Sequence, residues 1–160
     1  MTVLNVDKDF DTLSLTLTAE FDATVEQVWE LWKDPRKLEK WWGPPGYPAT
    51  FESFDLEPGG DVTYFMTGPD GQKFHGYWKV TAVNPPKSLA FDDGFANADG
   101  SHNDQMPTTS GMVELSEADG RTRMTISSTT TSREHLETLI SMGMIEGLTA
   151  AVGQMDSLLS

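Results

Sequence analysis

The 160-residue sequence contains no cysteine, few basic residues and no long apolar run. Without cysteine the chain can form no disulfide, no thiolate nucleophile and no thiolate metal site. No stretch approaches the roughly 18 consecutive apolar residues of a membrane span. The first ten residues hold two acids, one lysine and no apolar core of a signal peptide. We therefore expect a soluble, cytoplasmic protein with no membrane partner.

The shortage of basic residues has a direct consequence for partners. Eleven Lys and Arg stand against 25 Asp and Glu, which gives a formal net charge of −14. A surface this acidic repels phosphate groups, so nucleic acid and anionic membranes are unfavourable partners. The densest basic group lies among acidic residues on one short predicted helix, and we interpret it as a solvated surface. It comprises Lys33, Arg36, Lys37 and Lys40.

What the sequence does contain is a long amphipathic segment at its C-terminal end, from Thr131 to Leu159. Apolar residues recur there at intervals of three and four, as along one buried face of a helix. They are Leu136, Leu139, Ile140, Leu148, Ala151, Val152, Met155, Leu158 and Leu159. Thr131 and Glu134 have the spacing of a capping box. We predict one helix of roughly 40 Å, since each residue adds 1.5 Å.

Three glycines lie inside this predicted helix, Gly143, Gly147 and Gly153. Each lowers helix stability by about 1 kcal/mol relative to alanine. Gly143 and Gly147 have the spacing of a membrane helix-pairing motif, but the segment is amphipathic and that interpretation fails. We expect close packing of the helix on a sheet at these positions, with a bend or space for a ligand as the alternative.

The preceding residues divide into one strand, two short helices and a series of strands. Alternating apolar residues over 13–21 predict a half-buried strand. Thr24 and Gln27 form a second capping box, which predicts the start of a helix. Asp34 followed by Pro35 predicts the start of another helix. That helix ends before a Gly-Pro-Pro-Gly segment, which cannot remain helical.

Residues 49–130 predict six further strands, separated by turn sequences rich in glycine and proline. Six consecutive strands with tight connections are mostly antiparallel. Residues 92–106 are predicted to form a long mobile loop within this series. The fold class is therefore α+β: a curved antiparallel sheet of about seven strands wrapped around the long C-terminal helix, in one domain over 1–160. A curved sheet and a straight helix do not match everywhere, so we expect a pocket between them.

An ordered series of motifs resembles one family. The motifs are Phe21–Trp32, Lys40–Pro44, Asp55–Gly60, Gly68–Gly71, Pro85–Pro86, Met106–Thr109, Arg121–Met124 and Gly143–Gly147. They are similar to those of the bacterial homologues of the C-terminal domain of the heat-shock protein 90 ATPase activator. That family belongs to the START-related (Bet v-like, SRPBCC) superfamily. The match covers nearly the whole chain in order, and the ordered series is much more specific than any single motif.

The resemblance implies the helix-grip fold and a deep hydrophobic cavity between the sheet and the last helix. Superfamily members use this cavity for lipids, polyketides, hormones and other apolar ligands. The resemblance implies no shared catalytic residues. It also leaves a chaperone as an alternative partner, although the eukaryotic activator has a separate N-terminal chaperone-binding domain and these 160 residues contain no counterpart of it.

Methionines and inward aromatic residues predict the lining of this cavity. Thioether side chains fill irregular spaces and adapt to varied apolar shapes. Trp32 and one of Trp41 and Trp42 are expected in the core, with the other in the core or at the cavity mouth. The predicted ligand-binding residues are Trp42, Tyr64, Met66, Trp78, Phe91, Met124, Gly143, Met144, Gly147 and Leu148. A register slip of one residue would replace Tyr64 by Phe65 in this lining.

Little in the sequence indicates metal or acid–base chemistry. His75, His102 and His135 are far apart and have no metal-site spacing, so we predict no metal, no cofactor and no catalytic residues. Our leading hypothesis is a binding protein for a small hydrophobic ligand, lipid-like or aromatic, without catalysis. The alternatives are a chaperone-associated protein and a polyketide cyclase-type enzyme with His75 or Tyr64 as proton donor. The protein is expected to be a monomer, or a homodimer formed through an edge strand.

Overall fold

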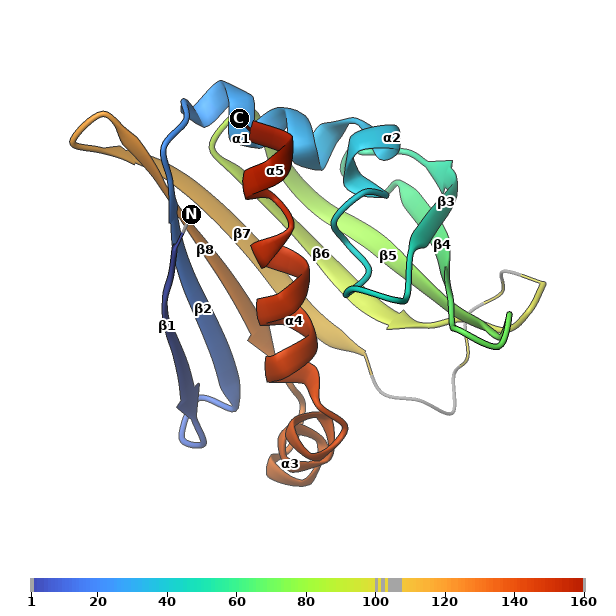
Figure 1. Ribbon diagram of the computed structural model, residues 1–160. Helices are drawn as coiled ribbons and strands as arrows, with labels where there is room; N and C mark the ends of the chain where they lie inside the picture. The colour runs from blue at the N-terminus through green and yellow to red at the C-terminus, as the bar shows by residue number, and fades with distance from the viewer. Residues whose placement is uncertain (1, 100, 102, 104–107, 160) are drawn as a thin grey trace.

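In the computed structural model, which describes residues 2–99, 101, 103 and 108–159, an antiparallel sheet wraps around the C-terminal helices (Figure 1). The strands are β1 Thr2–Asp9, β2 Ser14–Phe21, β3 Ala49–Phe54, β4 Asp61–Thr67, β5 Lys73–Asn84, β6 Ser88–Phe95, β7 Thr109–Ala118 and β8 Arg121–Thr129. The helices are α1 Val25–Lys33, α2 Pro35–Leu38, α3 Arg133–Ser141, α4 Met144–Gly153 and α5 Asp156–Leu159. The predicted α+β helix-grip fold is confirmed.

The sheet has the strand order β1-β2-β8-β7-β6-β5-β4-β3, and every neighbouring pair is antiparallel. Helices α1 and α2 lie along one end of the sheet, and α4 crosses in front of it between β2 and β3 (Figure 1). The predicted caps of both short helices are present. Thr24 and Gln27 form the reciprocal capping box of α1, and the Asp34 carboxylate accepts from the Arg36 backbone N–H at the start of α2.

The sheet has eight strands rather than about seven, because β1 precedes the first predicted strand. Strand β1 lies at the edge of the sheet and pairs only with β2. Its polar side chains at Asn5, Asp7 and Asp9 are exposed, and Val6 packs against the core. A strand with so little apolar alternation gives no periodic signal in the sequence.

The prediction of a loop from residue 92 is wrong at its start, because β6 continues to Phe95. Asp93 pairs with Trp78 on β5 and with Thr109 on β7, so it lies inside the sheet. Backbone hydrogen bonds to two neighbouring strands override the preference of an Asp-Asp-Gly sequence for a turn. Residues 100, 102 and 104–106 of the predicted loop lie outside the described residues.

The predicted single C-terminal helix is instead three helices, with a bend of 59° between α3 and the α4–α5 segment. Gly143 lies at the break with φ 88°, a left-handed conformation that favours glycine. The cap of α3 is Ser132 rather than Thr131, because the Ser132 hydroxyl accepts from the His135 backbone N–H. Within the described residues no single helix is long and apolar enough to cross a membrane, and these helices reach the required length only as a bent pair.

A cluster of aromatic side chains forms the centre of the core. Trp32, Trp41 and Trp78 are fully buried, and Trp78 stacks on Phe91 with ring centroids 4.3 Å apart. The Trp41 indole N–H donates to the Leu31 carbonyl at 3.0 Å, which satisfies its polar atom. The core therefore fixes the ends of α1 and α2 against the middle of β5 and β6.

Candidate functional site

Two adjoining chambers lie between the sheet and the break in the C-terminal helices. The α3–α4 chamber, of about 380 Å³, lies beside the bend, and the α4 chamber, of about 240 Å³, lies beneath α4. Both are lined by Tyr64, Met66, Asp93, Thr109 and Met144, so they form parts of one cavity. Together they are large enough for a small organic ligand, since such pockets measure about 300–1,000 Å³.

Helix α4 leaves open space at Gly147, which lines the α4 chamber. Apart from its chain neighbours and the backbone of its own helical turns, a Cβ atom added at Gly147 would meet no atom of the described residues within 4 Å. The expected close packing at this glycine is therefore wrong, and space beside the helix is the correct alternative. Gly143 also has open surroundings, with only a Glu146 carboxylate oxygen at 3.9 Å, and its role is the positive φ of the bend. The break in the helix therefore helps to create the cavity.

Glycines on neighbouring strands provide the space for two aromatic side chains of the lining. Gly76 is paired with Tyr64, and a Cβ at Gly76 would lie 2.6 Å from the Tyr64 ring. Gly111 is paired with Phe91, and a Cβ there would lie 2.9 Å from the Phe91 ring. Glycine inside a strand often marks such a close approach. Both rings can therefore lie flat across the adjacent strand on the face toward the helices.

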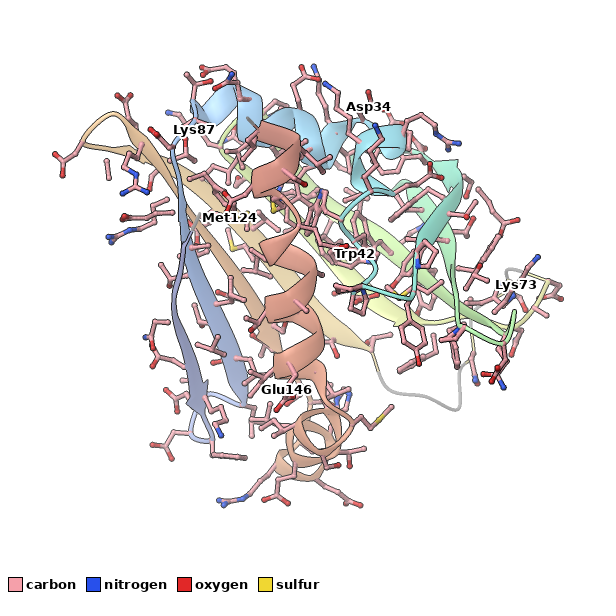
Figure 2. All side chains as sticks on the ribbon, viewed as in Figure 1. Asp34, Trp42, Lys73, Lys87, Met124 and Glu146 are labelled. Carbon is pink, nitrogen blue, oxygen red and sulfur yellow. The ribbon has the colours of Figure 1, made fainter. Side chains whose placement is uncertain are left out.

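The structure brings most of the predicted ligand-binding residues to this cavity. Those that line it are Trp42, Tyr64, Met66, Phe91, Gly143, Met144, Gly147 and Leu148. Trp42 lies close to α4 (Figure 2), whereas Trp41 is fully buried in the core. The remaining two, Trp78 and Met124, are fully buried core residues that do not line either chamber. Contact between the lining residues and a ligand stays a prediction.

Sequence reasoning missed the carboxylate at the centre of the cavity. Asp93 lines both chambers, and its Oδ1 atom accepts a hydrogen bond from the Tyr64 hydroxyl at 3.3 Å. Burial raises the pKa of Asp93 to about 7, and the hydrogen bonds from Tyr64 and from the Gly94 backbone N–H oppose that shift only in part. Asp92 and Asp93 resembled loop residues in the sequence. The sequence signal that could have placed both residues in a strand is the apolar strand sequence that directly precedes them.

The Tyr64 hydroxyl lies in an equally apolar environment. Burial, and then the negative charge of Asp93, raise the pKa of Tyr64 well above its usual value. The nearby indole N–H groups of Trp42 and Trp78 lower this pKa, although neither N–H donates a hydrogen bond within the described part of the chain. Near neutral pH the Tyr64 hydroxyl therefore stays protonated, whereas the carboxyl group of Asp93 is protonated in only part of the molecules.

The histidines do not gather at one place. His75 is half-buried and lines the α3–α4 chamber. His135 is buried at the start of α3, and burial lowers its pKa. His102 lies outside the described residues. Within the described part of the chain, no three His, Asp or Glu side chains come close enough together to hold a metal ion.

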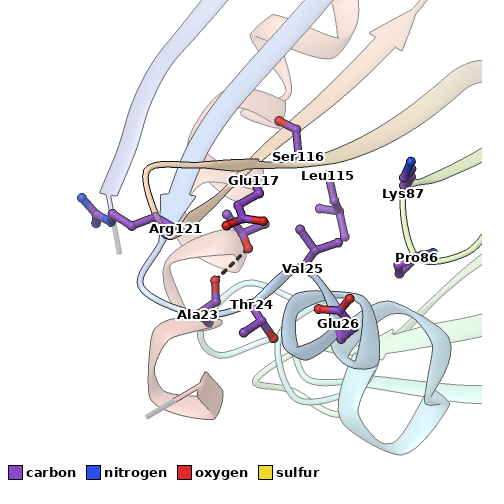
Figure 3. A pocket seen from close by; sticks show the side chains of 12 residues that line it. Ala23, Thr24, Val25, Glu26, Pro86, Lys87, Leu115, Ser116, Glu117 and Arg121 are labelled. Carbon is purple, nitrogen blue, oxygen red and sulfur yellow. Dashed lines mark hydrogen bonds between the residues drawn. The ribbon is translucent and has the colours of Figure 1, made fainter.

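A larger hollow of about 530 Å³ lies at the opposite end of the strands, between the start of α1, the β5–β6 turn and the β7–β8 hairpin (Figure 3). Its lining mixes charged groups of both signs, among them Glu26, Lys87, Glu117 and Arg121. The Thr122 hydroxyl donates to the Ala23 carbonyl at 2.7 Å and joins the two sides. Because charged side chains make up much of its lining, this hollow lacks the predominantly apolar lining typical of ligand pockets.

The eight-stranded sheet, the two short helices and the cavity beneath the C-terminal helices define a helix-grip, ligand-binding fold. Residues 22–160 match the family model of the Activator of Hsp90 ATPase homolog 1-like protein. The chain belongs to this family.

Solved structures of bacterial proteins share the whole fold. The crystal structure of protein Ms6760 from Mycobacterium smegmatis is similar over 99% of this chain and 98% of that chain, with 50% sequence identity and a TM-score of 0.92. A solution structure from Arthrobacter aurescens shows 49% identity and a TM-score of 0.94 over 99% of this chain and 92% of that chain. The AHSA1 protein from Silicibacter pomeroyi shows 25% identity and a TM-score of 0.73, over 91% and 96% of the two chains. No curated protein matches the sequence.

Proposed function

We propose that the protein is a cytoplasmic binding protein for a small hydrophobic molecule, lipid-like or aromatic, and that it performs no catalytic step. The observation that supports this function is the cavity between the sheet and α4, with its apolar lining and the open space beside Gly147. Each ligand methylene transferred from water into such a cavity contributes about 0.8 kcal/mol.

The side chains around the α3–α4 chamber support the same function. Phe74, Phe95 and Met142 line this chamber and are 51%, 37% and 62% exposed. Large apolar side chains that remain in water beside a cavity are typical of binding sites. Met142 and Met144 lie on either side of the bend, where flexible thioethers can adapt to ligands of different shape. We therefore place the opening of the cavity at this chamber.

Filling the α4 chamber tests the proposal. The neutral dye Nile red is titrated into the wild-type protein, the variant Gly147→Leu and the control Ala150→Leu, while native mass spectrometry examines the purified protein for a retained ligand. The added side chain of Gly147→Leu occupies the chamber, whereas Ala150 is exposed on the same helix. We expect dye binding to wild type and control and its loss in Gly147→Leu. Equal binding by all three proteins, or no binding by any, would exclude ligand binding in this cavity.

The family match supports a second candidate, a chaperone-associated protein. The matching model describes homologues of an Hsp90 ATPase activator, and it covers residues 22–160. Titration of the protein into bacterial heat-shock protein 90, with ATP hydrolysis as the readout, tests this function. An increase in the ATPase rate supports it. An unchanged rate, together with no complex in a pull-down, removes it.

A further inference from the structure

The lining of the two chambers is mostly apolar and includes a single carboxylate, that of Asp93. The titratable residues that line the two chambers are Tyr64 on β4, His75 on β5 and Asp93 on β6. Helices α3 and α4 contribute no titratable side chain to the lining of these two chambers. Their lining residues are Leu139, Met142, Gly143, Met144, Gly147, Leu148 and Ala151. Glu134 and His135 of α3 line an adjoining hollow of about 250 Å³, which shares Phe95, Leu139 and Met142 with the α3–α4 chamber. Strands β7 and β8 contribute Thr109, Gly111, Ile126 and Ser128.

Asp93 accepts hydrogen bonds without meeting a cation. The Tyr64 hydroxyl donates to its Oδ1 atom, and the Gly94 backbone N–H also stabilises the carboxylate. No lysine or arginine of the described residues forms an ion pair with it. Asp93 is half-buried. A carboxylate withdrawn in part from water without a counter-charge is unfavourable, and it is a strong acceptor for any cationic donor that reaches it.

Aromatic rings beside the Asp93 carboxylate also favour the binding of a cationic group. Tyr64 and Trp42 have ring centroids 6.2 Å apart, and both line the α4 chamber. The electron-rich face of an aromatic ring attracts an ammonium group, and tryptophan does so most strongly. The net charge of −14 also raises the concentration of cations near the protein and lowers that of anions.

We propose that the ligand is an amphiphilic amine, whose ammonium group binds the Asp93 carboxylate while its apolar chain or ring system occupies the space beneath α4. This inference rests on the proposed binding function and names the ligand class for the same cavity. A fatty acid is disfavoured, because its carboxylate would face that of Asp93. A neutral alcohol of the same length can bind, but it lacks the charge-assisted hydrogen bond.

The proposal requires a particular dependence on pH. Asp93 has a pKa of about 7, so it is mostly ionised above that pH and mostly protonated below it. A primary alkylamine stays protonated over this range, since simple ammonium groups titrate near pH 10. Affinity for the amine therefore falls as the pH decreases through 7. His75 is a further titratable side chain that lines the α3–α4 chamber, so the test must separate its effect from that of Asp93.

The test compares decylamine, decanol and decanoate as competitors of Nile red at about pH 5.5 and about pH 8.5, on either side of the carboxyl titration. For the wild-type protein at the higher pH we expect decylamine to bind about ten-fold more tightly than decanol, the effect of one charge-assisted hydrogen bond over a neutral one. Decanoate is expected to bind most weakly. The preference for the amine disappears at the lower pH.

Two variants separate the carboxylate from the histidine. Asp93→Asn abolishes both the preference for decylamine over decanol and the pH dependence of that preference. His75→Ala retains most of the pH dependence. Equal affinity of the wild-type protein for decylamine and decanol at the higher pH would overturn the amine inference, whether or not Asp93→Asn folds. In that case binding of Nile red and decanol, blocked by Gly147→Leu, still supports the general binding function.

Discussion

The Tyr64 ring lies over Gly76 on the adjacent strand, so close that a Cβ atom at residue 76 would be 2.6 Å from its Cζ and hydroxyl oxygen atoms. The two residues are directly paired across β4 and β5. This contact places the hydroxyl where it reaches Asp93 on β6, at 3.3 Å. One glycine therefore determines the position of the only phenol–carboxyl pair found among the described residues of the cavity lining.

The first prediction concerns this contact. Gly76→Ala forces the Tyr64 ring out of its position, because the new Cβ atom would overlap the ring. We expect a loss of about 1–3 kcal/mol in the free energy of unfolding, the usual range for overpacking a core. Urea denaturation measures the change. The same substitution in a Tyr64→Ala background is the control, and there the loss should be much smaller, since the overlapping atoms are absent. Equal losses in both backgrounds would contradict the proposed contact.

Two glycines of the C-terminal helices are expected to respond oppositely to alanine. Gly147→Ala should raise the free energy of unfolding by about 1 kcal/mol, because alanine favours the helix and the added methyl group meets no atom within 4 Å. Gly143→Ala should lower the same free energy by about 1–2 kcal/mol, because φ is 88° there and alanine resists the left-handed conformation. Thermal and urea denaturation of both variants measure the two signs. A stable Gly143→Ala protein would show that the bend is not fixed by this glycine.

These two glycines also show how far the sequence determines the fold. Caps, turns and inward alternation predicted the order of elements from β2 to β8, because each depends on residues close together in the chain. Gly143 and Gly147 looked alike in the sequence, with the same local cost to a helix. The difference between them depends on backbone conformation at one site and open space at the other, and both are consequences of how the helices pack on the sheet.

The candidate site could be predicted in its apolar part and not in its polar centre. Tyr64 faces inward in the predicted register, because its strand alternates apolar and polar residues and Tyr64 and Val62 are both buried. Asp93 was misplaced, because a run of two aspartates followed by glycine favours a turn. Its place in the middle of β6 depends on hydrogen bonding to β5 and β7, which are distant in sequence.

The half-buried carboxyl group of Asp93 leads to a prediction about how stability depends on pH. The pKa of Asp93 is about 7 in the folded protein and 3.8 for the unperturbed group. The folded state therefore binds the proton more tightly, and this residue's contribution to stability falls as the pH rises from about 4 to about 7. The full difference is at most about 4 kcal/mol, at 1.36 kcal/mol for each pKa unit. Urea denaturation across this pH range measures it.

Asp93→Asn is the control variant for this pH dependence of the free energy of unfolding. Because His135 has a lowered pKa through burial, its contribution to stability rises with pH over part of the same range and opposes that of Asp93. The difference between wild type and Asp93→Asn removes the histidine contribution, which both proteins share. We expect the variant to gain stability relative to wild type as the pH increases toward 7. A constant difference across the range would show that the carboxyl group titrates normally.

Gln154 holds the C-terminal helices over the cavity. Its Nε2 atom donates to the Gly43 carbonyl at 2.7 Å and to the Trp41 carbonyl at 3.2 Å, which ties the end of α4 to the segment after α2. Gln154→Ala removes both bonds and should lower the free energy of unfolding by about 1–3 kcal/mol, because two carbonyls lose their donor. Ser157→Ala, one turn further on, is the control. It removes only an exposed hydrogen bond of 3.0 Å from the Ser157 hydroxyl to the Gln154 backbone carbonyl and leaves both bonds of the Gln154 side chain in place, so it should have little effect. If Gln154→Ala also weakens Nile red binding while the Ser157 control does not, the position of α4 over the sheet determines the shape of the cavity. An unchanged free energy of unfolding in Gln154→Ala would show that packing alone holds the helix.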